Sequence, residues 1–483
     1  MRLKEVYIDG YKNLNDFTVS FENKSYLDIF LGKNGLGKSN LFEALILIFG
    51  SLMSKSINTD FSYRIEYQLY SDTIKISYDF MEDERVLIVN DSHVSIKDIE
   101  VYIPHNIVLY YSGWSNRLEN IFGKFERKYK RRDKSSISYP LSFKENGVRF
   151  VGIKKIHIEL ILFSLLTFTN KLEISDFLKK YLNVENFENI DIVLKRPNAK
   201  NEFFTDVGDF WGIQHSPREF IRSLESSSLN VENNFTENLG LDPTKKTYKI
   251  RMKNNQRFQK LQNDFEKPSV FFQYLENLDI KNLLGSLEIK LKLTNGVTVT
   301  SEQLSEGQKQ IILIIGLIYL LEESESLILL DEPDTFLHPE WQRRFCKVAN
   351  EINDSEKNIH VLLTTHSPLI VQSTEDNNIF LLNESQENIT IRSNLSPLHN
   401  GRIDWVLTSD LFGLDSSRPL YMDNYMQLRK EVLSKKEISQ DDKRQLEKYG
   451  PNGILPSGET LDDVEAMQII HEAARAIKND KNK

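Results

Sequence analysis

The spacing of apolar residues at the N-terminus predicts strands, a glycine loop and a helix. Apolar side chains alternate with polar ones over residues 3–8 and again over 17–21, with a turn at 10–13, which indicates two joined strands. A compact apolar run over 26–31 predicts a buried strand. A helical spacing then runs from residue 38 to about residue 49.

The rest of the chain changes its pattern twice. Residues 61–102 have a period of two, which predicts an antiparallel meander. A mixed region follows, with helical stretches near 156–182 and 217–224. From residue 287 onward the pattern is α/β. It contains an alternating strand (287–293), a hairpin turn at Asn295-Gly296, and then a helix (311–321), a strand (327–330), a helix (339–352) and a strand (360–364).

Composition narrows the class of protein. The chain has 483 residues, 40% hydrophobic and 27% charged, with a net charge of −9, so nucleic acid would have to bind a local basic patch. Cys346 is the only cysteine, which excludes an internal disulfide and fits a reducing cytoplasm. The longest apolar run, 311–321, is about half of the roughly 20 residues that span a bilayer, and no signal segment is evident. We therefore expect a soluble cytoplasmic protein without a membrane partner.

The strongest motif is a phosphate-binding loop between the buried strand and the helix. Its sequence, Gly32-Lys33-Asn34-Gly35-Leu36-Gly37-Lys38-Ser39, matches G-x-x-x-x-G-K-S in the context that the motif requires. Lys38 is expected to bridge the β- and γ-phosphates of ATP and Ser39 to ligate Mg²⁺. The residues predicted to bind nucleotide here are Gly32, Lys33, Asn34, Gly35, Gly37, Lys38, Ser39 and Asn40.

A second motif places two carboxylates at the end of a buried strand. Four apolar residues, 327–330, precede Asp331 and Glu332, and ligands bind at this edge of parallel sheets. We expect Asp331 to hold Mg²⁺ and Glu332 to orient or deprotonate the attacking water. An acidic pair that ends a strand is often a plain loop, and the phosphate-binding loop is what favours the catalytic interpretation.

Two further motifs complete an ordered set. Leu304-Ser305-Glu306-Gly307-Gln308 precedes the apolar helix, where Ser305 and Gly307 leave backbone amides free for a phosphate. By itself this segment is only a good helix N-cap. His366 ends the strand at 360–364, where an imidazole can contact the γ-phosphate or the water, although a single histidine at a strand end is usually structural.

The order of these motifs resembles that of ABC-type ATPases. The opening residues 3–14, the stretch 332–339 and Thr365-His366-Ser367-Pro368 resemble the RecF/SMC/OLD branch of that class. The segment 404–414 looks like one in bacterial anti-phage ATPases of the Septu PtuA and retron-associated type, and PARIS-type ATPases have a similar layout. The resemblance covers roughly 1–50 and 287–375 well and the middle poorly.

The resemblance implies an α/β fold, namely an ABC-type P-loop NTPase head with an antiparallel β subdomain and a mostly helical insertion. It predicts four segments. They are the N-terminal part of the head (1–104), the insertion (105–285), the C-terminal part of the head (286–400) and a helical, partner-binding tail (401–483).

The resemblance also implies a division of labour between two heads. The phosphate-binding loop, Asp331, Glu332 and His366 of one head bind ATP with Mg²⁺, and Ser305 and Gly307 of a second head close over the γ-phosphate. Asp334 lies in the stretch that meets the partner head. Family members also sense Mg²⁺ with a glutamine, for which Gln214 is one candidate among several. The chain is thus expected to form at least a head-to-head dimer.

Three classes of biological function are compatible with this ATPase. An early Glu with a later Asp-x-Asp is absent, as is a His-Asn-His cluster, so we do not expect a nuclease in this chain. The leading hypothesis is a switch that regulates a separate nuclease in anti-phage defence. A recombination or repair ATPase acting on DNA and a transport-type subunit are the alternatives. The basic stretches 124–132 and 245–253 are candidates for nucleic-acid contact, although such runs are usually solvated faces.

Overall fold

A computed structural model gives the fold of the chain, which forms two compact units, residues 1–403 and 404–483. The structure describes residues 1–21, 26–33, 35–53, 59–112, 118, 120–125, 149–196, 209–212, 215–233, 247–265, 267–322, 324–335, 337–351, 358–374, 379–385, 388–393, 401–412, 414, 424, 427–428, 431–432 and 439–447.

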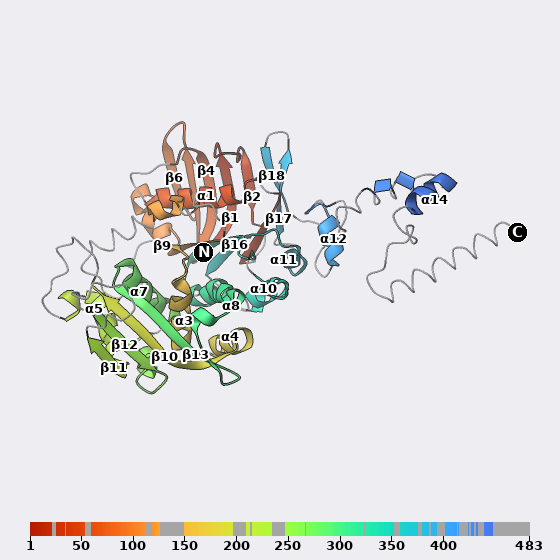
Figure 1. Ribbon diagram of the computed structural model, residues 1–483. Coiled ribbons are helices and arrows are strands. Elements are labelled where there is room, and N and C mark those ends of the chain that lie inside the picture. Colours follow the sequence, from red (N-terminus) through yellow and green to blue (C-terminus); the bar gives the residue numbers. More distant parts are fainter. Residues whose placement is uncertain are drawn as a thin grey trace. The chain divides into compact units, whose positions relative to one another are not determined.

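A seven-stranded sheet forms the centre of the first unit, and all its strand pairs are parallel except β17–β18 (Figure 1). In spatial order its strands are β18 Asn388–Arg392, β17 Ile379–Ser385, β3 Leu27–Leu31, β16 Ile359–Thr364, β15 Ser326–Asp331, β8 Asn106–Tyr111 and β9 Arg149–Gly152. Every residue of β3, β15 and β16 is buried, as expected for parallel strands covered on both faces. The predicted α/β class is confirmed.

A six-stranded antiparallel sheet packs beside it and confirms the predicted β subdomain. Its order is β2 Phe17–Ser20, β1 Arg2–Asp9, β4 Ser62–Leu69, β5 Asp72–Asp79, β6 Glu84–Val89 and β7 Ser92–His93. The meander ends earlier than predicted, because Ile96–Tyr102 forms a 3₁₀ helix, η1. Helix α1, Lys38–Met53, contributes Phe42 and Phe49 to a core cluster that also contains residues of both sheets.

The insertion contains a third sheet that the sequence pattern did not predict. Its order is β11 Asn230–Asn233, β12 Thr247–Lys253, β10 Val184–Lys195, β13 Leu284–Leu293 and β14 Thr298–Thr300, all antiparallel. The expected helices are present as α3 His157–Thr167, α4 Leu172–Leu182 and α5 His215–Ser226, together with α6 Gln259–Asp264 and α7 Pro268–Ile280. A short 3₁₀ turn, η2, covers Asp209–Gly212. The prediction of a mostly helical insertion is thus incomplete, because register shifts between Val184 and Asn186 and between Phe187 and Asn189 interrupt the two-residue period of β10.

The boundary of the insertion also differs from the expectation. The predicted insertion, 105–285, includes β8 and β9, but these are strands of the seven-stranded sheet, with β8 paired to β15. The uninterrupted apolar run Ile107–Tyr111 belongs to a strand buried on both faces, a pattern that periodicity cannot distinguish from a buried helix.

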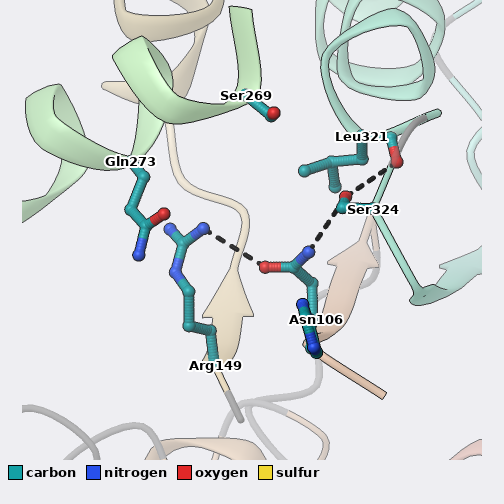
Figure 2. Close-up of a pocket in the computed structure, with 7 residues that line it drawn as sticks. Asn106, Arg149, Ser269, Gln273, Leu321 and Ser324 are labelled. Atoms are coloured by element: carbon teal, nitrogen blue, oxygen red, sulfur yellow. Dashed lines mark hydrogen bonds between the residues drawn. The ribbon is translucent and has the colours of Figure 1, made fainter. Parts of the chain in front are cut away.

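Buried polar side chains join β8 and β9 to the insertion at the amino-terminal edge of the central sheet. Figure 2 shows the Asn106 amide donating to Ser324 Oγ at 3.2 Å, and Arg149 Nη1 donating to Asn106 Oδ1 at 3.2 Å. Arg149 also forms a buried ion pair with Glu276 of α7. Asn106, Arg149 and Ser324 line a small pocket together with Gln273. The head and the insertion are therefore joined here by the Arg149–Glu276 ion pair, and hydrogen bonds within the head hold Arg149 in place.

The C-terminal part of the first unit follows the predicted order. After the 3₁₀ turn η3 Ser301–Gln303 come α8 Glu306–Ile311, a π-helical segment η4 Ile312–Gly316, and α9 Leu317–Leu321. Helices α10 Pro339–Glu351 and α11 Pro368–Gln372 follow β15 and β16. Gly316 allows close packing on α3, since a Cβ there would lie 2.8 Å from Ile161 Cγ2.

The second unit holds two described helices, α12 Ile403–Thr408, which begins at the boundary, and α14 Gln440–Glu447. Among the helices that the structure describes, none has both the length and the apolar composition of a membrane span.

Candidate functional site

The glycines of the phosphate-binding loop have the backbone conformation that the motif requires. The loop follows β3 directly, and α1 begins at Lys38. Gly32, Gly35 and Gly37 have φ values of +151°, +88° and +96°, which a residue with a side chain rarely adopts. The loop thus presents its amides and the positive N-terminus of α1 to the carboxyl edge of the central sheet.

Lys38 is buried within this loop. Its ammonium group donates to the carbonyl oxygen of Gly32 at 2.7 Å and lies 3.4 Å from that of Lys33. Burial lowers the pKa of Lys38, while the carboxylates of Glu332 and Asp331 act in the opposite direction. A buried ammonium group next to two carboxylates is a suitable partner for the phosphate oxygens of a nucleotide.

Ser39 and Asp331 meet because β3, β16 and β15 are adjacent in the sheet. Ser39 Oγ donates to Asp331 Oδ2 at 3.0 Å, and the Thr364 hydroxyl donates to the other carboxylate oxygen. Burial raises the pKa of Asp331, an effect that the hydrogen bonds from Thr364 and Ser39 oppose. A hydroxyl and a carboxylate at hydrogen-bond distance form a donor set that suits a divalent cation.

Glu332 is held in an unusual backbone conformation immediately after β15. Its φ is +51°, and its backbone N–H donates to Thr364 Oγ1 at 3.1 Å. The Ser112 hydroxyl, at the end of β8, donates to the Glu332 carbonyl at 2.6 Å. A non-glycine residue in the left-handed region is uncommon, and such residues cluster at functional sites. The two bonds fix the backbone of Glu332 at the sheet edge, and its half-exposed carboxylate lies 3.4 Å from His366 Nε2.

The environment of His366 favours its neutral form. Burial lowers the pKa of His366 from its ordinary value of 6.5, the charge of Lys38 lowers it further, and Asp331 opposes both. The ring is therefore expected to be neutral at pH 7 and able to accept a hydrogen bond. Since the unfolded chain binds this proton more readily, His366 contributes a loss of stability as the pH falls through about 6.5.

A histidine NMR titration of the nucleotide-free protein checks this assignment. The imidazole resonance that disappears in the His366→Gln variant is expected to titrate with a midpoint below 6.5. A midpoint above 6.5 would mean that the Glu332 carboxylate, and not burial, dominates the environment of the ring.

The signature segment forms the N-terminus of α8. Ser305 caps this helix by accepting from the Gln308 backbone N–H at 3.2 Å, and Gln308 Oε1 accepts from the Ser305 N–H at 3.0 Å. Gly307 lies in the first turn, where the nearest atom to an added Cβ is Trp341 Cδ1 at 3.8 Å. Among the described residues, no hydrogen bond or ion pair joins Ser305 or Gly307 to the phosphate-binding loop of the same chain.

Gln310, on the same helix as the signature, connects it to the end of β15. Its amide donates to the carbonyl oxygen of Pro333 at 2.8 Å and to Tyr110 Oη at 2.6 Å, and the side chain is buried. Asp334, predicted to meet a partner head, is also buried and accepts from Thr365 Oγ1 at 2.8 Å. Burial raises the pKa of Asp334.

Several site residues were not singled out in the sequence. They are Thr364 and Ser112, which position Asp331 and Glu332, and Asn13, which contacts the phosphate-binding loop. Of these three residues, only Thr364 could have been found from the sequence, because it lies at the end of a predicted strand, two residues before His366. Asn34 and Gln214, and the parts 126–132 and 245–246 of the basic stretches, lie outside the described residues.

Asn13 braces the phosphate-binding loop from the turn between β1 and β2. Its side-chain amide donates to the Gly35 carbonyl at 3.4 Å, and its Oδ1 accepts from Asn40 Nδ2 at 2.6 Å. The same oxygen lies so close to Gly37 that a Cβ added there would be 2.9 Å from it.

We expect Asn13→Ala to weaken ATP binding by roughly fivefold to tenfold, the equivalent of about one hydrogen bond. Titration with a fluorescent ATP analogue measures this, with Asn90→Ala, in the distant β6–β7 turn, as the control. Equal affinities in both variants would contradict a bracing role.

Comparison with known proteins gives a family and relatives. Residues 1–371 match the AAA ATPase domain family. The chain is 24% identical to the retron Ec83 probable ATPase of Escherichia coli over 91% of this chain and 82% of that protein. It is 23% identical to the Septu protein PtuA of Bacillus thuringiensis, with 89% of each chain covered. The predicted resemblance to retron-associated and Septu ATPases is confirmed.

Solved structures share less with the chain. The SMC head domain from Thermotoga maritima is 13% identical, with 82% of this chain and all of that chain covered, at a TM-score of 0.37. The recombination mediator protein RecF with ATP is 16% identical, with 81% and 98% covered, at a TM-score of 0.34.

Proposed function

The chain belongs to the AAA ATPase domain family, and from that premise we propose that it binds and hydrolyses MgATP as the switch of a separate nuclease in anti-phage defence. The observation that carries the ATPase part is the convergence of Lys38, Ser39, Asp331, Glu332 and His366 at one sheet edge. Similarity to the retron and Septu ATPases supports the role in defence.

Each residue has a distinct part in the proposed hydrolysis. Lys38 and the loop amides hold the phosphates, and Ser39 and Asp331 would hold Mg²⁺, which neutralises charge on the phosphates when bound. The described residues include no cluster of three or more metal-ligating side chains, so water and phosphate oxygens would complete the coordination, as Mg²⁺ prefers. Glu332 accepts a proton from the water that attacks the γ-phosphorus, and neutral His366 hydrogen-bonds that water or the γ-phosphate.

A second head completes the proposed site. The signature N-terminus of α8 presents backbone amides capped by Ser305, but within one chain it makes no described contact with the phosphate-binding loop. Such a helix end suits a γ-phosphate bound to another copy of the chain. We therefore propose a head-to-head dimer in which ATP joins two copies and hydrolysis separates them.

One experiment tests both parts of the proposal. Phosphate release by the purified chain is measured with and without Mg²⁺, with DNA, and with any nuclease that a neighbouring gene is found to encode. The proposal expects Mg²⁺-dependent hydrolysis and a complex in which nuclease activity follows the nucleotide state. Strong stimulation by DNA alone, with no nuclease partner bound, would instead support the recombination or repair alternative. A lack of hydrolysis under every condition would overturn the ATPase assignment.

A further inference from the structure

The five-stranded sheet of the insertion has two faces of opposite character. Tyr248, Ile250 and Met252 of β12 lie in register with Leu194, Ile192 and Ile190 of β10, and this apolar face is largely buried. Contacts of α3 with β10 and β13 place that helix on this side. In Figure 1 the strands lie at the lower edge of the first unit, with α3 and α7 between them and the central sheet.

The other face carries an excess of basic side chains. The register places Lys249, Arg251 and Lys253 of β12 on it, alternating with the apolar residues. Three further lysines join them from neighbouring strands, namely Lys195 of β10 and Lys290 and Lys292 of β13. The acidic residues on this side are Asp191, Glu288 and the exposed bulge residues Glu185 and Glu188 of β10, so six positive charges face four negative ones. We call the six basic residues the basic sheet face.

The acidic residues on this face do not cancel its charge. Asp191 accepts from Arg251 Nε at 2.8 Å and Nη2 at 2.7 Å, and Lys249 Nζ lies 3.3 Å away. Burial alone would raise the pKa of Asp191, but these bonds and charges outweigh it and hold the pKa below its usual range. Asp191 therefore stays ionised and fixes the heads of two of the six cations.

The remaining lysines lack acidic partners in the part of the chain that the structure describes. Lys253 and Lys292 are exposed, and Lys195 and Lys290 are partly exposed. Lys253 and Lys290 flank Asn189 from either side, about 10 Å apart across three strands, and Lys290 and Lys292 are about 7 Å apart along one strand. Thr300 and Thr298 of β14 add hydroxyl donors beside these two lysines. Lysines, an amide and hydroxyls in regular rows are the groups that contact phosphates.

We propose that the basic sheet face binds the phosphate backbone of a nucleic acid without reading its sequence. The chain as a whole has a charge of −9, so a net positive patch on one sheet face is not a consequence of composition. No aromatic side chain lies on this face of the described strands, which favours backbone contacts over base stacking. The face uses no residue of the nucleotide site, so this inference stands or falls independently of the proposed function.

Binding is tested by fluorescence anisotropy of the full-length protein with short labelled duplex DNA, single-stranded DNA and RNA. The wild type is expected to bind at least one of these probes, with an affinity that falls steeply between about 50 mM and about 200 mM salt. Lys290→Glu/Lys292→Glu is expected to weaken binding by about tenfold or more and to lower the salt slope by about two. Glu288→Lys adds positive charge to the same face and is expected to tighten binding.

The matched control reverses two lysines elsewhere, Lys75→Glu/Lys97→Glu in β5 and η1, and changes the net charge equally. All variants are compared in melting temperature and basal ATP hydrolysis, which are expected to be unchanged. The proposal is overturned if the control weakens binding as much as the sheet-face pair, or if Glu288→Lys and the pair both bind as the wild type does. It is also overturned if the wild type binds no probe at low salt but does bind an acidic polypeptide.

Discussion

Replacing Glu332 by glutamine is expected to slow ATP hydrolysis by roughly a hundredfold to ten-thousandfold while ATP still binds, the range typical for loss of a general base. The amide of glutamine has nearly the same shape as the carboxylate, but it cannot accept a proton from water. The bonds that hold residue 332 come from its backbone, through Thr364 and Ser112, so the substitution leaves the positioning of the backbone intact. Lys38 and Ser39, which hold the phosphates, also remain unchanged.

Two measurements separate this result from a folding defect. Phosphate release gives the rate, and binding of a fluorescent ATP analogue gives the affinity, which is expected to stay near that of the wild type. With MgATP the variant is also expected to accumulate as a larger species in size-exclusion chromatography, because two heads stay joined without turnover. Glu340→Gln, on the exposed side of α10, is the control and should hydrolyse ATP normally. Normal turnover by Glu332→Gln would show that another group is the base.

The elements around the nucleotide site were predictable because each has a short and specific pattern. The strand, glycine loop and helix at residues 27–53 are signalled by local sequence, and so are the buried strands that end at Asp331 and Thr364. Parallel strands buried on both faces are uniformly apolar, and the chemistry follows directly after them in the sequence. That regularity makes the carboxyl edge of such a sheet the most readable part of the chain.

The insertion was not predictable in the same way, because its pattern depends on tertiary contacts. Strand β10 is bounded by Val184 and Lys195, and its inner residues are all buried, because β12 and β13 cover both of its edges while helices cover one face. The register also shifts twice near its start, so Val184, Phe187 and Ile190 are three residues apart and the period of two is lost there. The basic run at 245–253 was visible, but only the register shows that Lys249, Arg251 and Lys253 share one face with lysines from β13.

The supporting residues of the site show a second limit of sequence reasoning. Ser112 lies about 220 positions before Glu332 in the chain, and Asn13 precedes Gly35 by 22 residues. Serine, threonine and asparagine are common in turns, so a single one does not indicate a functional site until the fold places it.

Gln310 shows how the fold can connect two motifs that lie apart in the sequence. It lies in the signature helix, yet its amide binds the Pro333 carbonyl beside Asp331 and Glu332. The signature helix is thereby linked to the loop that follows β15 in the same chain.

A mixture of two inactive variants is expected to regain activity if the ATP site is shared between heads. Lys38→Met removes the charge that holds the phosphates, and Gly307→Asp places a carboxylate in the first turn of α8, where a γ-phosphate from a partner would bind. Residue 307 has room for this side chain, since the nearest atom to its Cβ is 3.8 Å away. Each variant alone is expected to lose nearly all hydrolysis, because both sites of a two-fold dimer carry the same defect.

In a mixed dimer one site combines the intact phosphate-binding loop of the Gly307→Asp chain with the intact signature of the Lys38→Met chain. The other site carries both defects. With random pairing half of the dimers are mixed, and each has one good site, so equal amounts should restore about a quarter of wild-type hydrolysis. Phosphate release after mixing measures this, and a mixture of Lys38→Met with Glu332→Gln is the control. Both of those changes lie on the phosphate-loop side, so every mixed site keeps one defect and no activity should return. No recovery in the first mixture would show that each chain hydrolyses ATP within its own head, and Ser305 and Gly307 would then have no role in a partner's site. Recovery in the control would show instead that Lys38 and Glu332 serve one site from different chains.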